Sequence, residues 1–305
     1  MSDYQRIAVP VRGGDLAVGI WGPDDGAPVL AVHGVTASHL SWPFVAAHLA
    51  GIRLIAPDLR GRGCSNGLPG PWGMPQHADD LAAVLDALNI DRAVVLGHSM
   101  GAFVSLVLAN RHPDRVVSLV LVDGGLPFTA PEGVSDEEIT RATLGPAAER
   151  LSMTFDSRAQ YTEFWKKHPA FAGNWNQVVQ DYVDYDLVGE EPVLRPSSSY
   201  EAVAADSIDL RGGESVLKAL RELAHPTTFI AAPRGLMNEV PPLYSQDAIA
   251  AWRQKLPGLM PLRVEDVNHY TIVMSDRGAA RVADVVAGAV QAVEDSAAKD
   301  SEAQA

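Results

Sequence analysis

A serine between two glycines is the first candidate for chemistry in this chain. Ser99 lies at the centre of Gly97-His98-Ser99-Met100-Gly101, which matches the pattern Gly-x-Ser-x-Gly. The apolar run Ala93–Leu96 precedes the motif, and the helical stretch Met100–Asn110 follows it. A sharp turn from strand to helix would expose the serine hydroxyl, and the flanking glycines leave room for that turn. This context predicts that Ser99 is a nucleophile.

A second match to the same pattern lies at Gly63-Cys64-Ser65-Asn66-Gly67. Arg60-Gly61-Arg62 precedes it and Leu68-Pro69-Gly70-Pro71 follows it, so neither a strand nor a helix is expected beside Ser65. Because the functional motif needs both elements, Ser65 is predicted to be a loop residue.

The elements that would position Ser99 alternate between strands and helices. Short apolar runs predict buried parallel strands at Val29–Val32, Arg53–Ala56, Ala93–Leu96 and Val116–Val122. Helices are expected between them at His39–Leu49, Gln76–Leu88 and Met100–Asn110. The earlier runs Ile7–Pro10 and Leu16–Trp21 have no helix between them and predict an antiparallel hairpin. The alternation predicts an open α/β fold, with a mostly parallel sheet flanked by helices on both faces.

The alternation stops near Phe128 and resumes at Thr227–Ala232 and Leu262–Val267. Amphipathic helices and no strand are expected in between, so residues 128–224 are predicted to form a helical cap inserted into a core of residues 1–127 and 225–293. Such a cap would cover the carboxyl ends of the strands, where open α/β sheets bind ligands. The Ala-, Ser- and acid-rich residues 294–305 are predicted to be a disordered acidic tail.

Together these motifs resemble the α/β-hydrolase-fold serine hydrolases that carry a helical cap. His33-Gly34 resembles the family's oxyanion loop, residues 58–65 resemble its loop after the next strand, and Asn268-His269 resembles its catalytic histidine segment. The resemblance spans about residues 4–290. It implies an esterase-like enzyme in which a serine, a histidine and an acid act together.

His269 is the predicted general base. It lies in a loop after a late strand, where the family's chain order of serine, acid and histidine places the base. A neutral imidazole can accept the serine proton near pH 7. His33 is expected to be architectural, and His98 is expected to fill the turn and point away from the nucleophile's side. The remaining histidines are expected on helices or their ends, solvated or capping: His39, His48, His77, His112, His168 and His225.

The acid that should orient His269 is missing from the family's usual position, which Gly235 occupies here. Two carboxylates could replace it. Asp123 ends the run Val116–Val122, where some family members carry the acid, although Asp-Gly-Gly is also common turn chemistry. Glu239 follows the usual strand several residues too late and could equally be a solvated charge. Asp123 is the preferred acid, and Glu239 is the alternative.

The oxyanion that forms on attack needs backbone N–H donors fixed in advance. By resemblance these donors are Val35, which follows His33-Gly34, and Met100, which follows the nucleophile. Gly34 would leave room for the substrate carbonyl. The alternative for His33-Gly34-Val35 is a plain turn at the end of a strand.

Aromatic residues are enriched in the predicted cap, which has eight of the chain's 20 between Phe155 and Tyr185. At least five of the eight are expected to pack the cap onto the sheet. The others could form an apolar substrate pocket. Trp165 and Trp175, with Trp42 near the oxyanion loop, are predicted to contact substrate.

Composition excludes several other classes of protein. Lys and Arg number 24 and Asp and Glu number 38, and the net charge of −14 argues against nucleic acid or an anionic membrane as partner. The apolar runs are too short to span a bilayer, and the first residues lack a signal-peptide core, so a cytoplasmic protein is expected. Cys64 is the single cysteine and no histidine pair has ligand spacing, so no disulfide, metal or cofactor is expected.

The sequence therefore predicts a hydrolase that cleaves small or medium hydrophobic carboxylic esters through an acyl-enzyme. Cleavage of carbon–carbon bonds, amides or lactones, or perhydrolysis, stays open as an alternative on the same fold. A non-catalytic receptor for a small ligand is the alternative from another class. The expected partner is a small hydrophobic ester-like substrate, and a homo-oligomer stays open.

Overall fold

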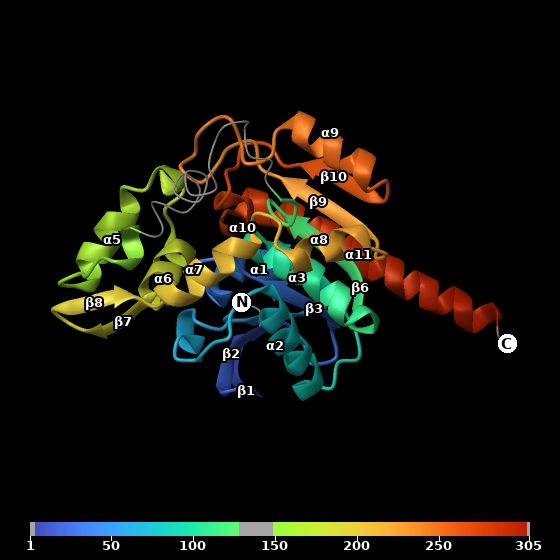
Figure 1. The fold of residues 1–305 in the computed structure, drawn as a ribbon, viewed down its shortest axis with the longest axis horizontal. Helices are drawn as coiled ribbons and strands as arrows, with labels where there is room; N and C mark the ends of the chain where they lie inside the picture. Colours follow the sequence, from blue (N-terminus) through green and yellow to red (C-terminus); the bar gives the residue numbers. More distant parts are fainter. Residues whose placement is uncertain (1–3, 128–148, 304–305) are drawn as a thin grey trace.

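A twisted sheet forms the centre of the molecule (Figure 1). In the computed structural model, which describes residues 4–127 and 149–303, eight strands form this sheet in the order β1-β2-β4-β3-β5-β6-β9-β10. Their bounds are β1 Tyr4–Val11, β2 Gly14–Trp21, β3 Ala27–Val32, β4 Ile52–Pro57, β5 Ala93–His98, β6 Val116–Val122, β9 Thr227–Ala231 and β10 Leu259–Arg263. The predicted α/β fold and its strand order along the chain are confirmed.

The register of the strands explains why the sheet is mostly parallel. β1 and β2 form the expected antiparallel hairpin, with Val9 opposite Leu16, and β2 also runs antiparallel to β4. From β4 to β10 every neighbouring pair is parallel. Because parallel strands end at the same edge of a sheet, the segments that follow β3, β5 and β6 meet there.

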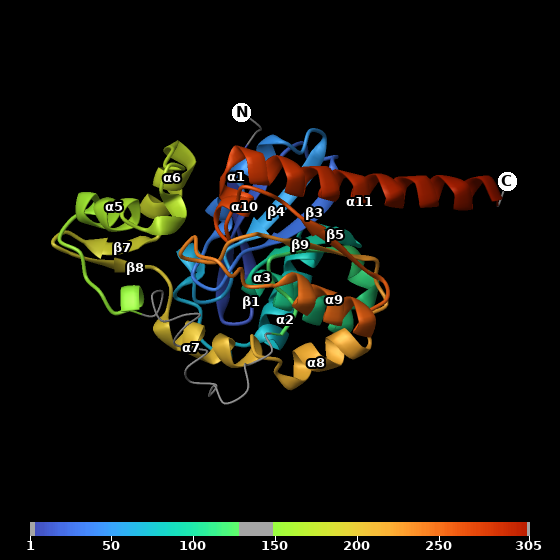
Figure 2. The ribbon, with the colours of Figure 1, turned by 90° about the horizontal axis from the view of Figure 1, so that it is seen from above.

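Helices cover both faces of the sheet (Figure 2). One face carries η1 His39–Ser41, α1 Pro43–Ala47, α10 Thr271–Met274 and α11 Asp276–Ala303. The other carries α2 Met74–Ala87, α3 Met100–Arg111, α8 Glu214–Arg221 and α9 Gln246–Lys255. Short turns η2 Gly63–Ser65 and η3 Pro113–Arg115 lie in the connections. Alternate residues of one strand serve the two cores, since Val95 packs on the α3 side and Leu96 on the α11 side.

The insertion between β6 and β9 contains the elements that lie beyond the carboxyl ends of the strands. They are α5 Arg158–Lys166, η4 Pro169–Phe171, α6 Gln177–Tyr185, β7 Leu187–Glu190, β8 Val193–Pro196 and α7 Tyr200–Asp209 (Figure 1). The expectation of no strand is wrong here, because β7 and β8 form an antiparallel hairpin. Residues 128–148 of the predicted cap lie outside the described residues, and the cap's boundaries stay a prediction.

Two differences concern the end of the chain. The expectation of a disordered tail from residue 294 is wrong for most of it, because α11 continues to Ala303. Alanine, glutamate and lysine are strong helix formers, and extending an existing helix costs less than nucleating one. β10 begins at Leu259, before the predicted run Leu262–Val267, and ends at Arg263 within it, which leaves the residues after Arg263 in a loop. Within residues 4–127 and 149–303, every helix is either too short or too polar to span a lipid bilayer.

Candidate active site

Ser99 occupies a strained turn between β5 and α3. Its backbone has φ 54° and ψ −122°, a conformation that L residues rarely adopt. Its N–H donates to the carbonyl of Val122 on the neighbouring strand at 2.9 Å, which holds the turn against β6. The turn therefore places the Ser99 side chain beyond the strand ends, as the motif predicts.

Glycines at three positions allow the chain to pass close to this turn. A Cβ at Gly97 would lie 2.5 Å from the Cα of Ala102, and one at Gly101 would lie 1.9 Å from the carbonyl oxygen of Val32. A Cβ at Gly124 would lie 2.1 Å from the carbonyl oxygen of Ser99 itself. Gly97 and Gly101 belong to the motif. We did not predict from the sequence that Gly124 is needed here. The feature that could have indicated it is its position directly after Asp123.

His269 and Asp123 form a buried pair. His269 Nδ1 donates to Asp123 Oδ2 at 2.7 Å, and the side chains are 5% and 0% exposed. The other carboxylate oxygen of Asp123 accepts the N–H of Ala232 at 3.1 Å. With its proton on Nδ1, the neutral ring leaves Nε2 free to accept a proton. This is the arrangement predicted for the base and its preferred acid.

Glu239, the alternative acid, lies elsewhere. Its side chain is exposed, and Oε2 accepts the N–H of Met237 at 2.6 Å within the same turn. Its main-chain carbonyl accepts the N–H of Gly235 at 3.0 Å. The loop thus closes on itself, and the carboxylate does not reach His269.

His98 has a role that the sequence did not reveal. Its Nε2 donates to the carbonyl oxygen of His269 at 2.8 Å, and the two rings lie 4.8 Å apart. Burial, together with the nearby His269 ring, holds the pKa of His98 well below its usual value. His98 is therefore a neutral donor that fixes the backbone of His269, and the expectation that it only fills the turn is wrong. The only feature of the sequence that pointed to a role for His98 in the site was its position next to Ser99.

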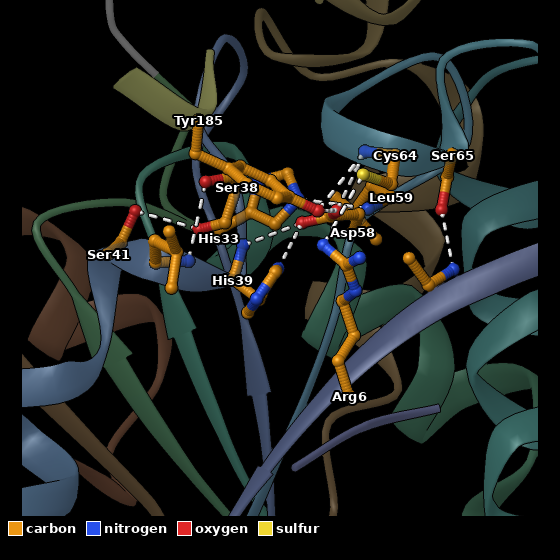
Figure 3. Close-up of polar contacts among 12 residues, drawn as sticks. Arg6, His33, Ser38, His39, Ser41, Asp58, Leu59, Cys64, Ser65 and Tyr185 are labelled. Carbon is orange, nitrogen blue, oxygen red and sulfur yellow. Dashed lines mark hydrogen bonds and ion pairs between the residues drawn. The ribbon is translucent and has the colours of Figure 1, made fainter. Parts of the chain in front are cut away.

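The loop after β3 is held by His33 (Figure 3). His33 Nδ1 donates to the carbonyl of Gly34 at 2.8 Å, and His33 Nε2 accepts the N–H of Leu59 at 2.9 Å. Burial lowers the pKa of His33 to about 4, so the neutral tautomer with a proton on Nδ1 persists. Because a peptide unit is planar and trans, fixing the Gly34 carbonyl also fixes the direction of the Val35 N–H.

The residues around Ser99 and His269 and the loop after β3 line one cavity. It is lined by Gly34, Val35, Thr36, Ala37, Ser41, His98, Ser99, Met100, Phe103, Asp123, Gly124, Tyr182, Leu210, Leu236, Leu243, His269, Tyr270, Val273 and Met274. The predicted nucleophile, base, acid and both predicted oxyanion donors therefore share a single cavity with Gly34.

The three tryptophans predicted to contact substrate do not line this cavity. Trp42 is fully buried in the core on the α11 side, with its ring against that of His98. Trp165 is buried among aromatic rings of the insertion, and Trp175 packs at the edge of that cluster against Phe171. Their large apolar rings are used for packing. Five of the eight aromatics between Phe155 and Tyr185 are buried, which confirms that at least five are core.

A second polar cluster lies beside the oxyanion loop and joins the insertion to the sheet domain (Figure 3). The Asp58 carboxylate accepts from His39 Nδ1 at 2.8 Å, from the Cys64 N–H at 2.9 Å and from the Tyr185 hydroxyl at 2.5 Å. Tyr185 is the last residue of α6. Burial opposes ionisation of Asp58, but these donors outweigh it, and the pKa of Asp58 is lowered.

This cluster and its neighbours correct two expectations about histidines. His39 and His77 are both fully buried rather than solvated. His39 pairs with Asp58, while His77 Nε2 pairs with Asp206 of α7 at 2.9 Å. Ser65, in contrast, lies in a short turn as expected, and its hydroxyl accepts the N–H of Ala17 at 2.9 Å. Among the described residues, no group of three or more His, Cys, Asp or Glu could hold a metal ion.

The parallel sheet, the strained serine turn and the inserted elements define an α/β-fold hydrolase. The chain matches the family described as alpha/beta hydrolase fold over residues 27–273, and it belongs to that family.

Individual relatives differ in what their names describe. Lipase LipV from Mycobacterium tuberculosis is 41% identical over 130 residues, which are 43% of this chain and 48% of that protein. The chain thus matches about half the length of that relative. 2-(Acetamidomethylene)succinate hydrolase from Mesorhizobium japonicum is 27% identical over 263 residues, 84% of this chain and 86% of that protein. The crystal structure of E-2-(acetamidomethylene)succinate hydrolase is similar in fold, with a TM-score of 0.75 and 20% identity over 95% of this chain and 100% of that one.

Proposed function

We propose that the protein is a serine hydrolase that cleaves small or medium hydrophobic carboxylic esters through an acyl-enzyme. One observation carries this proposal. The buried pair of His269 and Asp123, 2.7 Å apart, shares a cavity with Ser99 and with the loop that contains Val35. A serine needs such a base to become nucleophilic, and the base needs an acid to hold its tautomer.

The proposed reaction uses these residues in two stages. Ser99 Oγ attacks the ester carbonyl while His269 Nε2 accepts its proton, and the N–H groups of Val35 and Met100 bind the oxyanion. His269 then gives the proton to the leaving alcohol, and the acyl group stays on Ser99. Water, activated by the same imidazole, releases the acid and restores the hydroxyl. Asp123 orients the ring throughout and stabilises its protonated form.

The cavity wall favours an apolar acyl or alcohol group. Six of the lining residues have large or branched apolar side chains: Phe103, Leu210, Leu236, Leu243, Val273 and Met274. Such a wall stabilises a substrate by removing its apolar surface from water. No cofactor takes part in this scheme.

A second candidate is hydrolysis of a substrate that carries a carboxylate, and a particular observation favours it. Arg150 is buried, and its Nη2 has no hydrogen-bond partner in the described part of the chain. Arg150 does not line the cavity, but its guanidinium lies over the ring of Trp165, which contacts Tyr270 of the cavity wall. The relative that matches over 84% of this chain is named for a succinate derivative. Nη1 of Arg150, however, already pairs with Asp186, which makes this the second candidate.

A fluorophosphonate probe tests the proposed nucleophile. The purified protein is expected to be labelled at Ser99, and labelling should be lost in Ser99→Ala but retained in Ser65→Ala. A series of p-nitrophenyl esters of increasing acyl length, each compared with an ester of similar length that ends in a carboxylate, then ranks the two candidates. A protein that neither reacts with the probe nor cleaves any ester would be a receptor or would use other chemistry.

A further inference from the structure

Arg62 is a buried cation with several partners near the cavity. Its side chain is 0% exposed, although it lies in the loop that follows β4. A buried guanidinium costs considerable desolvation free energy unless its donors are satisfied. The direction of each of its N–H groups therefore indicates what the side chain does.

Two of those directions lead to the proposed oxyanion donors. Arg62 Nε donates to the carbonyl oxygen of Val35 at 2.9 Å, and Nη2 approaches the sulfur of Met100 at 3.8 Å. Nη1 donates to the carbonyl of Arg60 at 2.9 Å, which fixes the guanidinium on its own loop. One planar group thus touches both residues whose N–H groups would bind the oxyanion.

The loop around Val35 depends on such side-chain contacts. Residues 33–38 form no strand or helix, so no ladder of backbone hydrogen bonds holds them. His33 fixes the carbonyl before the Val35 N–H, and Arg62 fixes the carbonyl after it. With both neighbouring peptide units held, the Val35 N–H has little freedom to turn.

Arg62 is in turn held by the insertion. Its Nη1 pairs with Asp206 Oδ2 of α7 at 2.5 Å, and Asp206 also accepts from His77 and from the Gly73 N–H. Burial opposes ionisation of Asp206, but His77 and Arg62 outweigh it and lower its pKa to about 2. The carboxylate is therefore charged across the working pH range, and it connects α7 to the oxyanion loop through one side chain.

From this geometry we infer that Arg62 is a positioning residue that orients the N–H of the proposed oxyanion donor Val35. Because Arg62 also pairs with Asp206, the position of α7 influences that orientation. The inference rests on the proposed function. Lysine could not replace Arg62 in this role, because an ammonium group lacks the planar fork that serves Val35, Arg60 and Asp206 at once.

Arg62→Lys and Arg60→Lys form a matched pair that tests the inference. Arg60 is a buried arginine of the same loop whose side chain pairs with Asp80 and touches neither oxyanion donor; it contacts Arg62 only through its main-chain carbonyl, which lysine keeps. In assays with a p-nitrophenyl ester, active sites are first counted by the extent of fluorophosphonate labelling, so that loss of folded protein does not count as loss of rate. Arg62→Lys should lower kcat per site by about 10- to 100-fold, because a displaced donor fails mainly in the transition state, with KM changed less than about threefold. Arg60→Lys should keep kcat per site within about threefold of the wild type.

Inhibitors separate positioning from a general loss of structure. A trifluoromethyl ketone forms a tetrahedral adduct whose oxyanion occupies the donor site, so its inhibition constant should rise in Arg62→Lys by about the same factor as kcat falls. The constant for the product carboxylic acid, a ground-state ligand, should stay near the wild-type value. Equal kcat per site in the two lysine variants would overturn the inference. So would a rise of the same factor in the inhibition constants of the ketone and of the product acid in Arg62→Lys.

Asp206→Asn gives an independent variant if Arg62→Lys does not fold. It keeps the shape of the side chain but removes the charge that holds Arg62, so kcat per site should fall by about 3- to 10-fold in the same direction. An unchanged kcat in Asp206→Asn would overturn the connection from α7. Failure of the proposed function is distinguishable, because the wild type itself would then neither label nor hydrolyse esters.

Discussion

The side chains of Asp123 and His269 are 2.7 Å apart, and Asp123 directly follows β6, the neighbour of β5, which Ser99 follows. β9, whose following loop contains Gly235, lies between β6 and β10. The proposed acid and the proposed nucleophile thus follow neighbouring strands, while the proposed base approaches from the loop beyond β10. Asp123 has φ 46°, so both residues at these strand ends adopt left-handed conformations that aim their side chains into the cavity.

Replacing Asp123 tests this relationship. Asp123→Asn keeps the size of the side chain but cannot hold the charged form of the imidazole, so kcat should fall by about 10²- to 10⁴-fold with little change in KM. Glu239→Gln is the control, and it should cost less than about tenfold, because that carboxylate serves only its own turn. Kinetics on one p-nitrophenyl ester measure both. A severe loss in Glu239→Gln with a near-normal Asp123→Asn would contradict the assignment.

The two matches to Gly-x-Ser-x-Gly provide another matched pair. Ser99→Ala should lower ester hydrolysis by about 10⁴-fold or more, since the attacking oxygen is removed. Ser65→Ala should change kcat by less than about threefold, because its hydroxyl only accepts the N–H of Ala17. Circular dichroism should show both variants folded. If Ser65→Ala lost more activity than Ser99→Ala, the nucleophile would be Ser65 and the assignment of Ser99 would be wrong.

Gly124 should tolerate no side chain. Gly124→Ala would place its Cβ 2.1 Å from the carbonyl oxygen of Ser99, so the turn must shift. We expect a loss of about 1–3 kcal/mol in the free energy of unfolding, as for other overpacked sites, together with a fall in kcat of at least about tenfold. Gly67→Ala is the control, because a Cβ there meets no atom within 4 Å and the change should be within about 0.5 kcal/mol. Urea unfolding and ester kinetics check both, and equal effects of the two alanines would contradict the close approach.

Much of this fold follows from local patterns in the sequence. Buried parallel strands are continuous apolar runs, which is why β3 to β6 could be placed to within a few residues. The motif around Ser99 could be distinguished from that around Ser65 because the functional motif needs a strand before it and a helix after it, and only Ser99 has both. The choice between Asp123 and Glu239 could not be made in this way, since it depends on which loop returns to His269 in space.

The missed features have the same physical origin. Arg62, His98 and Gly124 act through contacts with residues distant in sequence, and their types carry no pattern of their own. The β7–β8 hairpin has strands of only four residues, which is too short for a periodicity to stand out. The buried pairs of His39 and His77 depend on Asp58 and Asp206, which no local pattern joins to them.

His33 should make the fold sensitive to acid. Burial lowers its folded-state pKa to about 4, below the value of 6.5 of an unperturbed histidine. Between these two pH values the unfolded chain therefore binds more protons than the folded one. The contribution of His33 to stability is complete above pH 6.5 and is lost as the pH falls toward 4. At pH 5 the loss from His33 should be about 2 kcal/mol.

Urea unfolding of the wild type and His33→Asn at pH 7 and pH 5 measures this contribution. The variant should be less stable at pH 7, but its stability should fall by about 2 kcal/mol less between the two pH values. If both proteins lose the same free energy on acidification, His33 is protonated without cost in the folded state.

Tyr185 should stabilise the junction between the insertion and the sheet domain. Its hydroxyl donates to the buried Asp58 carboxylate at 2.5 Å and accepts the Cys64 N–H at 3.3 Å. Burial and the negative charge of Asp58 both raise the pKa of Tyr185, so the hydroxyl keeps its proton. Tyr185→Phe removes this donor while Asp58 keeps its bonds to His39, so we expect a loss of about 1–2 kcal/mol in the free energy of unfolding.

Tyr200→Phe is the control for this change, because Tyr200 is 59% exposed and its substitution should alter stability by less than about 0.5 kcal/mol. Urea unfolding measures the difference, and hydrogen exchange localises it. The amides of α6 should exchange faster in Tyr185→Phe, since that helix ends at the lost hydrogen bond, whereas those of α3 should change only with the global stability. Equal stability of the two phenylalanine variants would mean that the hydrogen bond between α6 and Asp58 contributes nothing to holding the insertion in place.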